Sequence, residues 1–186
     1  GKMITRGLGA GMNPEIGRKA AEESQNEIRD LLKGSDMVFI TCGLGGGTGT
    51  GASPVIAEIA KQASEEDSKK PLVIAVVTKP FFFEGGARQK IADEGYKNLA
   101  EKVDTIITVS NEKLLEIVDK KITFVDSFKI ADNVLRQGVQ GISEIITVPG
   151  LINADFSDVR NIMADTGSAL MGIGQGSGEN TAVDAV

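Results

Sequence analysis

The chain has 186 residues, of which 41% are hydrophobic and 25% charged, and its net charge is −6. This composition is that of an ordinary soluble protein of one domain or slightly more. The absence of histidine excludes imidazole catalysis and His-ligated metal sites, and the single cysteine, Cys42, excludes an internal disulfide. The acidic balance argues against nucleic-acid binding. No apolar run is long enough to span a bilayer, so we expect a soluble cytoplasmic protein.

The first half of the chain alternates between glycine-rich loops, helices and a short apolar strand. Asn13 and Pro14 form a typical helix start, because asparagine caps a helix well and proline fits its first turn. We predict, in order, a loop at 1–13, a helix at 14–33, a buried strand at 37–41, a glycine-rich loop at 43–51, a helix opened by Ser53 and Pro54, and a charged, exposed connection at 64–70.

The second half continues the alternation and contains one unusually long helical pattern. Its apolar residues keep helical spacing over residues 123–147, a length of about 37 Å at 1.5 Å per residue. We predict, in order, a strand at 72–77, a helix at 84–102, a strand at 105–109, a short helix begun by Asn111, the long helix, a short helix at 159–164 and a strand-like segment at 168–174.

Alternation of buried strands with helices predicts an α/β fold built on a parallel sheet. Ligands of such sheets bind beyond the carboxyl ends of the strands. The glycine-rich loop at 43–51 occupies such a position, and the loop at 1–13 precedes a helix start.

The loop Gly43–Gly51, with the sequence GLGGGTGTG, is the most informative segment. Its backbone N–H groups and the following helix N-terminus could converge on a phosphate, and Thr48 and Thr50 could donate hydroxyl hydrogen bonds to it. The loop lacks the Gly-Lys-Ser/Thr ending of a P-loop, and its glycine spacing differs from that of an NAD-type Rossmann enzyme. We interpret it as a polyphosphate cradle, with a plain flexible turn as the alternative.

Five further positions each admit two interpretations. Glu84 and Arg88 have the spacing of an exposed helical ion pair, but they could also contact a ligand. Phe128 is more often a core residue than a ligand contact. Asp132 in a helix interior is harder to explain by packing, and its carboxylate could accept the two N–H bonds that distinguish guanine from adenine. Asn111 could be a helix cap or a ligand contact.

Asn153, Asp155 and Asp158 form an Asn-x-Asp-x-x-Asp pattern in a predicted loop. One interpretation is structural, with Ser157 or Asp158 capping the following helix. The other is catalytic, because carboxylates are the plausible groups to orient a water molecule in a chain without histidine.

The string GGGTGTG after a strand is the signature of the tubulin/FtsZ GTPases, and the chain resembles that family. The flanking segment ITCGLGGGTGTGASPVIAEIAK is similar to bacterial FtsZ rather than to eukaryotic tubulin. The resemblance extends over nearly the whole chain, with Met12 as a departure where a small residue is usual. The segments that carry it, in order, are TRGLGAGMNPEIGR, VTKPFFFEGGAR, SNEKLL, FKIADNVLRQGVQGI, PGLINADFSDVR and GSALMGIG.

The resemblance implies a GTP or GDP site and a separate catalytic loop. The implied nucleotide contacts are Ala10 and Gly11 at the γ-phosphate, the signature residues Gly45, Gly46, Gly47, Thr48, Gly49 and Thr50, Glu84 and Arg88 at the ribose and nucleotide edge, Phe128 stacked on the base, Asp132 reading it, and Asn111 at the ribose or base. Asp155 and Asp158, supported by Asn153, would orient water against the γ-phosphate of a neighbouring subunit. Mg²⁺ is implied through the nucleotide rather than through protein ligands.

The resemblance implies a Rossmann-like parallel-sheet GTPase domain of the tubulin/FtsZ type with a long central helix. It would cover residues 1–147, followed by a catalytic loop and helix at 148–166 and the start of a second domain at 167–186. The chain would be the central part of a longer protein, without the upstream strand, the first phosphate loop and the C-terminal tail that binds membrane-tethering partners.

The implied function is GTP-dependent, head-to-tail polymerisation into the bacterial division ring at mid-cell. The alternative is a nucleotide-binding filament scaffold or regulator that has lost hydrolysis, and the presence of Asp155 and Asp158 argues against it. The connection at 64–70 is longer than the family leads us to expect, and we assign it no function.

Overall fold

The computed structural model describes residues 1–63, 70–117, 123–148 and 155–169. Its centre is a parallel sheet with the strand order β1-β2-β3-β4. The strands are β1 (Met37–Gly43), β2 (Leu72–Lys79), β3 (Thr105–Ser110) and β4 (Gly167–Ala169). Met37 pairs with Leu72, Ile74 with Thr105, and Thr105 with Gly167. The predicted α/β fold with a parallel sheet is confirmed.

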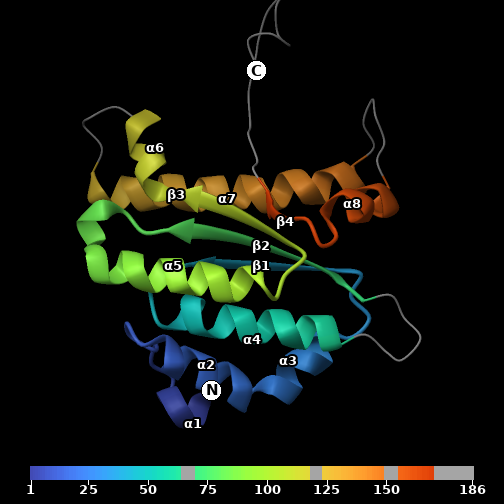
Figure 1. Cartoon of the computed structure of the whole chain (residues 1–186), viewed down its shortest axis with the longest axis horizontal. Helices are drawn as coiled ribbons and strands as arrows, with labels where there is room; N and C mark the ends of the chain where they lie inside the picture. The colour runs from blue at the N-terminus through green and yellow to red at the C-terminus, as the bar shows by residue number, and fades with distance from the viewer. Residues whose placement is uncertain (64–69, 118–122, 149–154, 170–186) are drawn as a thin grey trace, which may run out of the picture.

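Helices cover both faces of the sheet (Figure 1). α4 (Thr48–Gln62) and α5 (Gly86–Ala100) lie on one face, and α7 (Phe124–Thr147) lies on the other. α2 (Pro14–Glu23) and α3 (Gln25–Leu32) pack on the outside of α4, with the short α1 (Lys2–Thr5) beside α2. The remaining elements are the 3₁₀ turn η1 (Phe82–Glu84), α6 (Asn111–Ile117) and α8 (Phe156–Met163).

The two faces of β2 explain why this strand reads as one continuous apolar run. Val73, Ala75 and Val77 join the core beneath α4 and α5. Leu72, Ile74 and Val76 join the core beneath α7 and α8. A strand buried on both faces has no position for a polar residue, so its sequence cannot alternate.

Glycines let α2 lie directly against α4 and the loop before it. A Cβ atom on Gly51 would lie 1.9 Å from the carbonyl oxygen of Pro14, and one on Gly17 would lie 2.2 Å from that of Gly47. Any larger residue at either position would force the two helices apart. The glycine content of this region therefore serves helix packing as well as the loop itself.

The largest error of the sequence prediction concerns the start of α4. The helix begins at Thr48, not at Ser53, and Pro54 lies inside it. The first turn of a helix needs no intrahelical acceptors for its N–H groups. Glycine and threonine can therefore occupy that turn in spite of their poor helix propensity, provided that tertiary packing holds it.

The predicted helix over residues 14–33 is wrong in that it breaks at Ser24 into α2 and α3. The Ser24 hydroxyl accepts a hydrogen bond of 2.8 Å from the N-terminal amine of Gly1. The loop predicted at 1–13 likewise contains α1, whose Met3 and Ile4 N–H groups donate to Glu23 at 2.9 and 3.0 Å. A prediction from the local sequence pattern cannot take such long-range contacts into account.

Other predicted elements also have different boundaries in the structure. Gly85, at φ +94°, divides the predicted helix at 84–102 into η1 and α5. The helix predicted at 159–164 is α8, and β4 covers only the beginning of the strand-like segment, the rest of which lies outside the described residues. β4 pairs with β3, so residues 167–169 form part of the sheet. The second domain predicted to start at 167 stays a prediction. In the described ranges no helix is both long and apolar enough to cross a membrane.

Candidate nucleotide-binding site

The two glycine-rich loops meet at the N-terminus of α4, beyond the carboxyl end of β1. The Gly47 N–H donates to the carbonyl oxygen of Gly11 at 2.6 Å, and the Ala10 N–H donates to Oγ1 of Thr48 at 3.2 Å. A Cβ atom on Gly47 would lie 2.5 Å from the Gly11 oxygen and 2.7 Å from that of Ala10. Only glycine allows this approach, so the loop at 7–13 is fixed directly against the signature loop.

Inside the signature loop, threonine side chains hold the backbone. Gly45 has a φ of +100°, and its N–H donates to Oγ1 of the buried Thr50 at 2.9 Å. A Cβ atom on Gly49 would lie 2.5 Å from the carbonyl oxygen of Gly43, whereas Gly46 has open space around it. The Thr50 oxygen is therefore engaged within the loop, while Gly46 lies where a ligand could approach.

The N-terminus of α4 has the properties of an anion site. Its N-cap, Gly47, provides no side-chain hydrogen bond, and its first turn contains no acidic residue. The first N–H groups of a 15-residue helix thus remain available for a ligand, and the helix dipole favours negative charge there. A phosphate could bind in this geometry, and the predicted cradle stays a prediction.

Glu84 and Arg88 lie at the border of this cradle and form the ion pair that we considered as the alternative. Arg88 Nη1 lies 2.6 Å from Glu84 Oε2, and Glu84 Oε1 accepts the Phe81 N–H at 2.9 Å. The Arg88 carbonyl oxygen faces the signature loop, since a Cβ on Gly45 would lie 2.9 Å from it. A ligand that used Glu84 or Arg88 would compete with this pair.

Phe128, in the first half of α7, belongs to an aromatic cluster beside the end of β2. Its ring meets the buried Phe81 edge to face at a centroid distance of 5.3 Å, and it meets Phe124 at 5.1 Å. Phe83 stacks on Phe81 at 4.7 Å. Phe128 remains 36% exposed, which leaves part of its ring free to stack on a flat ligand.

Asp132 and Asn111 lie near the ends of two strands. Asp132 is exposed one helical turn beyond Phe128 and shares a groove of about 760 Å³ with Thr41 of β1. Asn111 follows β3 directly and is 4% exposed, and its Oδ1 has no hydrogen-bond partner among the described residues. A buried acceptor without a donor is costly, and a ligand N–H or O–H could satisfy it.

α8, which follows Asp155, lies at the opposite end of the sheet (Figure 1). α8 contacts the residues at which the strands start: Met163 accepts a hydrogen bond from Thr105, the first residue of β3. Asp155 and Asp158 form a reciprocal capping box of 2.9 and 3.1 Å at the N-terminus of α8. The cap is thus Asp155 rather than Ser157 or Asp158. The predicted role of Asn153 falls outside the described residues.

The separation of the two ends is set by the strands. The 7 residues of β1 span about 23 Å, and the signature loop follows their carboxyl end while α8 lies at their amino end. The carboxylates of Asp155 and Asp158 therefore cannot reach the signature loop of the same chain.

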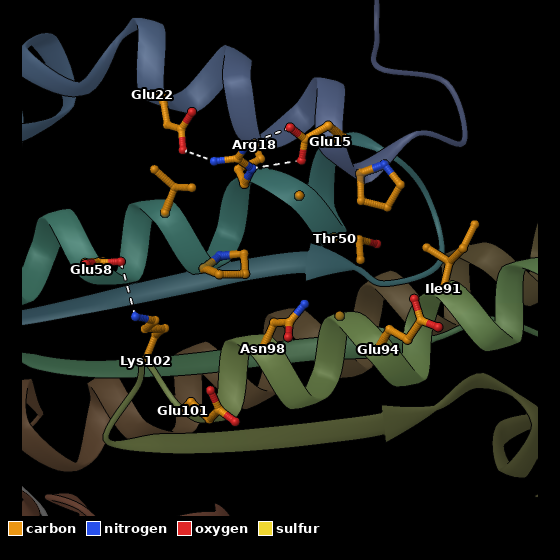
Figure 2. A pocket seen from close by; sticks show the side chains of 15 residues that line it. Glu15, Arg18, Glu22, Thr50, Glu58, Ile91, Glu94, Asn98, Glu101 and Lys102 are labelled. Carbon is orange, nitrogen blue, oxygen red and sulfur yellow. Dashed lines mark hydrogen bonds and ion pairs between the residues drawn. The ribbon is translucent and has the colours of Figure 1, made fainter.

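A cavity of about 390 Å³ lies behind the cradle, between α2, α4 and α5 (Figure 2). Thr50 and Gly51 form part of its wall, so this cavity and the cradle share one stretch of backbone. Arg18 lies above it and pairs with Glu15 at 2.6 Å and with Glu22. Lys102, on the other side of the cavity, contacts Glu58 at 3.3 Å. The two positively charged side chains that line the cavity, Arg18 and Lys102, are therefore both paired. The cavity therefore offers no free cation to a phosphate.

Two groups near the cradle have shifted pKa values. The hydrogen bond and positive charge of Arg18 lower the pKa of the Glu15 carboxyl to about 2. Burial raises the pKa of the Cys42 thiol, which lies below Gly49 on β1.

Sequence reasoning missed Phe81, which connects Glu84 with Phe128. This residue is fully buried, binds Glu84 through its N–H, and packs its ring on Phe128. The available signal was the run Phe81–Phe83 after a strand-ending proline, since three adjacent aromatic residues cannot all face one core. Within the described ranges, no cluster of three or more acidic or sulfur ligands could hold a metal ion.

Comparison with known proteins identifies the family. The family described as "Tubulin/FtsZ family, GTPase domain" matches residues 1–119, and the chain belongs to this family. It is 51% identical, with a TM-score of 0.92, to the structure "FtsZ dimer, empty (M. jannaschii)", covering 100% of this chain and 52% of that one. A W319Y mutant of M. jannaschii FtsZ matches with the same identity and TM-score, covering 100% of this chain and 54% of that one.

A more distant structure shares the fold. It is CetZ2 from Haloferax volcanii, described as a GTPgS-bound protofilament, with 23% identity and a TM-score of 0.72 over 91% of this chain and 48% of that one. This chain therefore spans about half the length of the structures that it matches.

Proposed function

We propose that this chain is the nucleotide-binding part of a GTPase that polymerises head to tail, and that one subunit completes the hydrolytic site of the next. The observation that carries this proposal is the placement of the phosphate cradle and the Asp155–Asp158 pair at opposite ends of one parallel sheet. If subunits stack along the strand direction, the end of one subunit that carries Asp155 and Asp158 meets the end of the next that carries the phosphate cradle.

The residues of the cradle fit a guanine nucleotide. The signature loop offers backbone N–H groups and a helix N-terminus to the phosphates. The part-exposed ring of Phe128 offers a stacking surface for the base, and the unpaired Oδ1 of Asn111 offers an acceptor for a ribose or base donor. Asp132 would accept the N1 and N2 hydrogens of guanine, which adenine does not present in the same pattern.

In the proposed mechanism the chain acts mainly by positioning, as phosphoryl transfer requires. The amides at the start of α4 hold the phosphates, and Ala10 and Gly11 close over the terminal one. Asp155 and Asp158 of the adjoining subunit then orient the attacking water and accept its proton. Mg²⁺, bound through the phosphate oxygens, would offset their negative charge.

The biological setting belongs to the same proposal. We infer that the filaments are those of a bacterial-type division ring, in the cytoplasm at mid-cell. Membrane tethers and regulators would bind outside the described residues, through a C-terminal tail. The similarity to an FtsZ dimer from M. jannaschii supports self-association as the primary interaction.

The deciding experiment measures GTP turnover per subunit of the full-length chain as a function of protein concentration. We expect negligible turnover in dilute protein and a rise above a threshold, because the site forms only between subunits. Light scattering on the same samples should show assembly at the same threshold. Turnover per subunit that is independent of concentration would refute the proposal, since each subunit would then carry its own catalytic groups.

A further inference from the structure

We propose that Arg160 is a positioning residue for hydrolysis, because it locks α8 onto the amino ends of two strands and thereby aims the Asp155–Asp158 pair. This inference rests on the proposed function, since it assigns a role toward carboxylates that act on the adjoining subunit. Arg160 follows Asp158 by two residues on the same short helix.

The contacts of Arg160 are made to backbone rather than to other side chains. Its Nη2 donates to the carbonyl oxygen of Lys70 at 2.6 Å and lies 3.5 Å from that of Asp36. Asp36 precedes β1 and Lys70 precedes β2, so one guanidinium spans the starts of two neighbouring strands. Both contacts are made by the one nitrogen Nη2, so a single positively charged donor forms the bridge.

A second contact holds the guanidinium against the helix itself. Its central carbon lies 5.2 Å from the centroid of the Phe156 ring, in cation–π geometry. Phe156 is the first residue of α8 and lies directly between Asp155 and the rest of the helix. Arg160 thus ties the residue next to the catalytic cap to the edge of the sheet.

The apolar anchors of α8 do not determine its orientation by themselves. Val159, Phe156 and Met163 pack against the core beneath α7, on one side of the helix only. A helix of 8 residues held by one apolar stripe can still roll or slide on the sheet. The hydrogen bonds from Arg160 to Lys70 and Asp36 add a restraint beside Phe156 that opposes this movement.

Nearby charges leave Arg160 free for this task. It shares a cavity of about 210 Å³ with Lys61, Asp104 and Asp165, and none of the ion pairs in the described residues involves Arg160. Asp104 is instead engaged by Lys61 at 3.1 Å and by the Val73 N–H at 2.8 Å. Because no carboxylate pairs with it, Nη2 of Arg160 is free to donate to the strand ends, while its buried Nε has no hydrogen-bond partner among the described residues.

The test compares Arg160→Gln and Arg160→Lys in the full-length chain with Arg29→Gln as a matched control. Arg29 lies on α3, on the outside of α4, and its side chain makes no hydrogen bond or ion pair among the described residues, so its loss should leave turnover unchanged. For Arg160→Gln we expect the plateau turnover per subunit to fall about ten- to a hundredfold, because a displacement of about 1 Å can cost that much. GTP affinity of the dilute subunit should remain unchanged, because the cradle lies at the other end. Arg160→Lys should recover most of the turnover.

Three results would overturn the proposed role of Arg160. Turnover within twofold of the unmodified chain for Arg160→Gln would overturn the proposal, and so would an equal loss of GTP affinity and thermal stability, which would indicate a merely structural role. Failure of the lysine variant to recover turnover would overturn it too. Asp155→Ala, measured in parallel, distinguishes failure of the proposed function from failure of the role of Arg160. If Asp155→Ala keeps full turnover, the proposed function itself is refuted. If Asp155→Ala is inactive while Arg160→Gln is fully active, only the role of Arg160 is refuted.

Discussion

Replacement of Gly47 by alanine is the most direct test of the phosphate cradle. The added Cβ would lie 2.5 Å from the carbonyl oxygen of Gly11, whereas ordinary contacts begin near 3.4 Å, so the loops must separate by about 0.9 Å. All three nearest atoms are backbone oxygens, of Gly11, Ala10 and Asn13, and none of them can rotate away as a side chain could.

The expected size of the effect follows from that displacement. Overpacking of this kind costs about 1–3 kcal/mol, and the 2.6 Å bond from the Gly47 N–H to the Gly11 oxygen is broken as well. If this strain raises the free energy of the GTP-bound state, GTP affinity falls about five- to 150-fold, because 1.4 kcal/mol corresponds to a factor of ten. Titration of the dilute full-length chain with a fluorescent GTP analogue measures this change directly.

Gly141→Ala provides the control. It is the same chemical change in the interior of α7, where no atom lies within 4 Å of the added Cβ. Alanine in a helix interior should raise stability by about 0.5–1 kcal/mol and leave GTP affinity unchanged. Unchanged GTP affinity in Gly47→Ala, with the fold intact, would refute the argument that close contact between the two loops creates the cradle.

Three further predictions concern individual side chains. Asp155→Asn keeps an equally good helix cap but removes the charge, so thermal stability should be preserved while assembled turnover falls by about a hundredfold or more; equal loss in both would mean that capping is its whole role. The Glu15 carboxyl should titrate with a midpoint of about 2 by NMR, and Arg18→Gln should move this midpoint upward, because Arg18 is the main cause of the low pKa. Since the folded pKa is the lower one, this pair contributes stability above the ordinary carboxyl pKa of 4.5, and that contribution is lost as pH falls toward 2. Cys42 should react with a thiol reagent at pH 8 more slowly than a free cysteine, because burial raises its pKa; a rate equal to that of the free amino acid would contradict its observed environment.

The parts of the fold that follow from local patterns could be predicted from the sequence. The strand at 72–77 and the helix at 123–147 have enough apolar residues to determine their own conformation, and the structure contains them as β2 and α7. The break at Ser24 could not be predicted in this way, since the contacts that α1 makes with Glu23 beside it come from residues 19 and 20 positions away. The early start of α4 depends on the packing of α2 against Gly51 in the same way.

The site follows a similar rule. Glycine and threonine in the order GLGGGTGTG indicate a phosphate loop, because few other functions require such a run. The contact between Gly47 and Gly11 spans 36 positions and was beyond any local argument, as was the bridge from Arg160 to Lys70. A phosphate loop could be predicted because its signal lies within one short segment. Contacts between segments that are far apart in the chain could not be predicted in this way.

The parallel direction of all four strands has a consequence beyond a single subunit. A sheet whose strands run one way has chemically different ends, with the glycine loops at one end and α8 at the other. A rod built by repeating such a unit with translation only is polar, and its two tips cannot be alike. In the proposed filament one tip would display the nucleotide site and the other the Asp155–Asp158 pair, so nucleotide exchange at the tips would be restricted to the first. Direction of growth would then be encoded in the sheet itself.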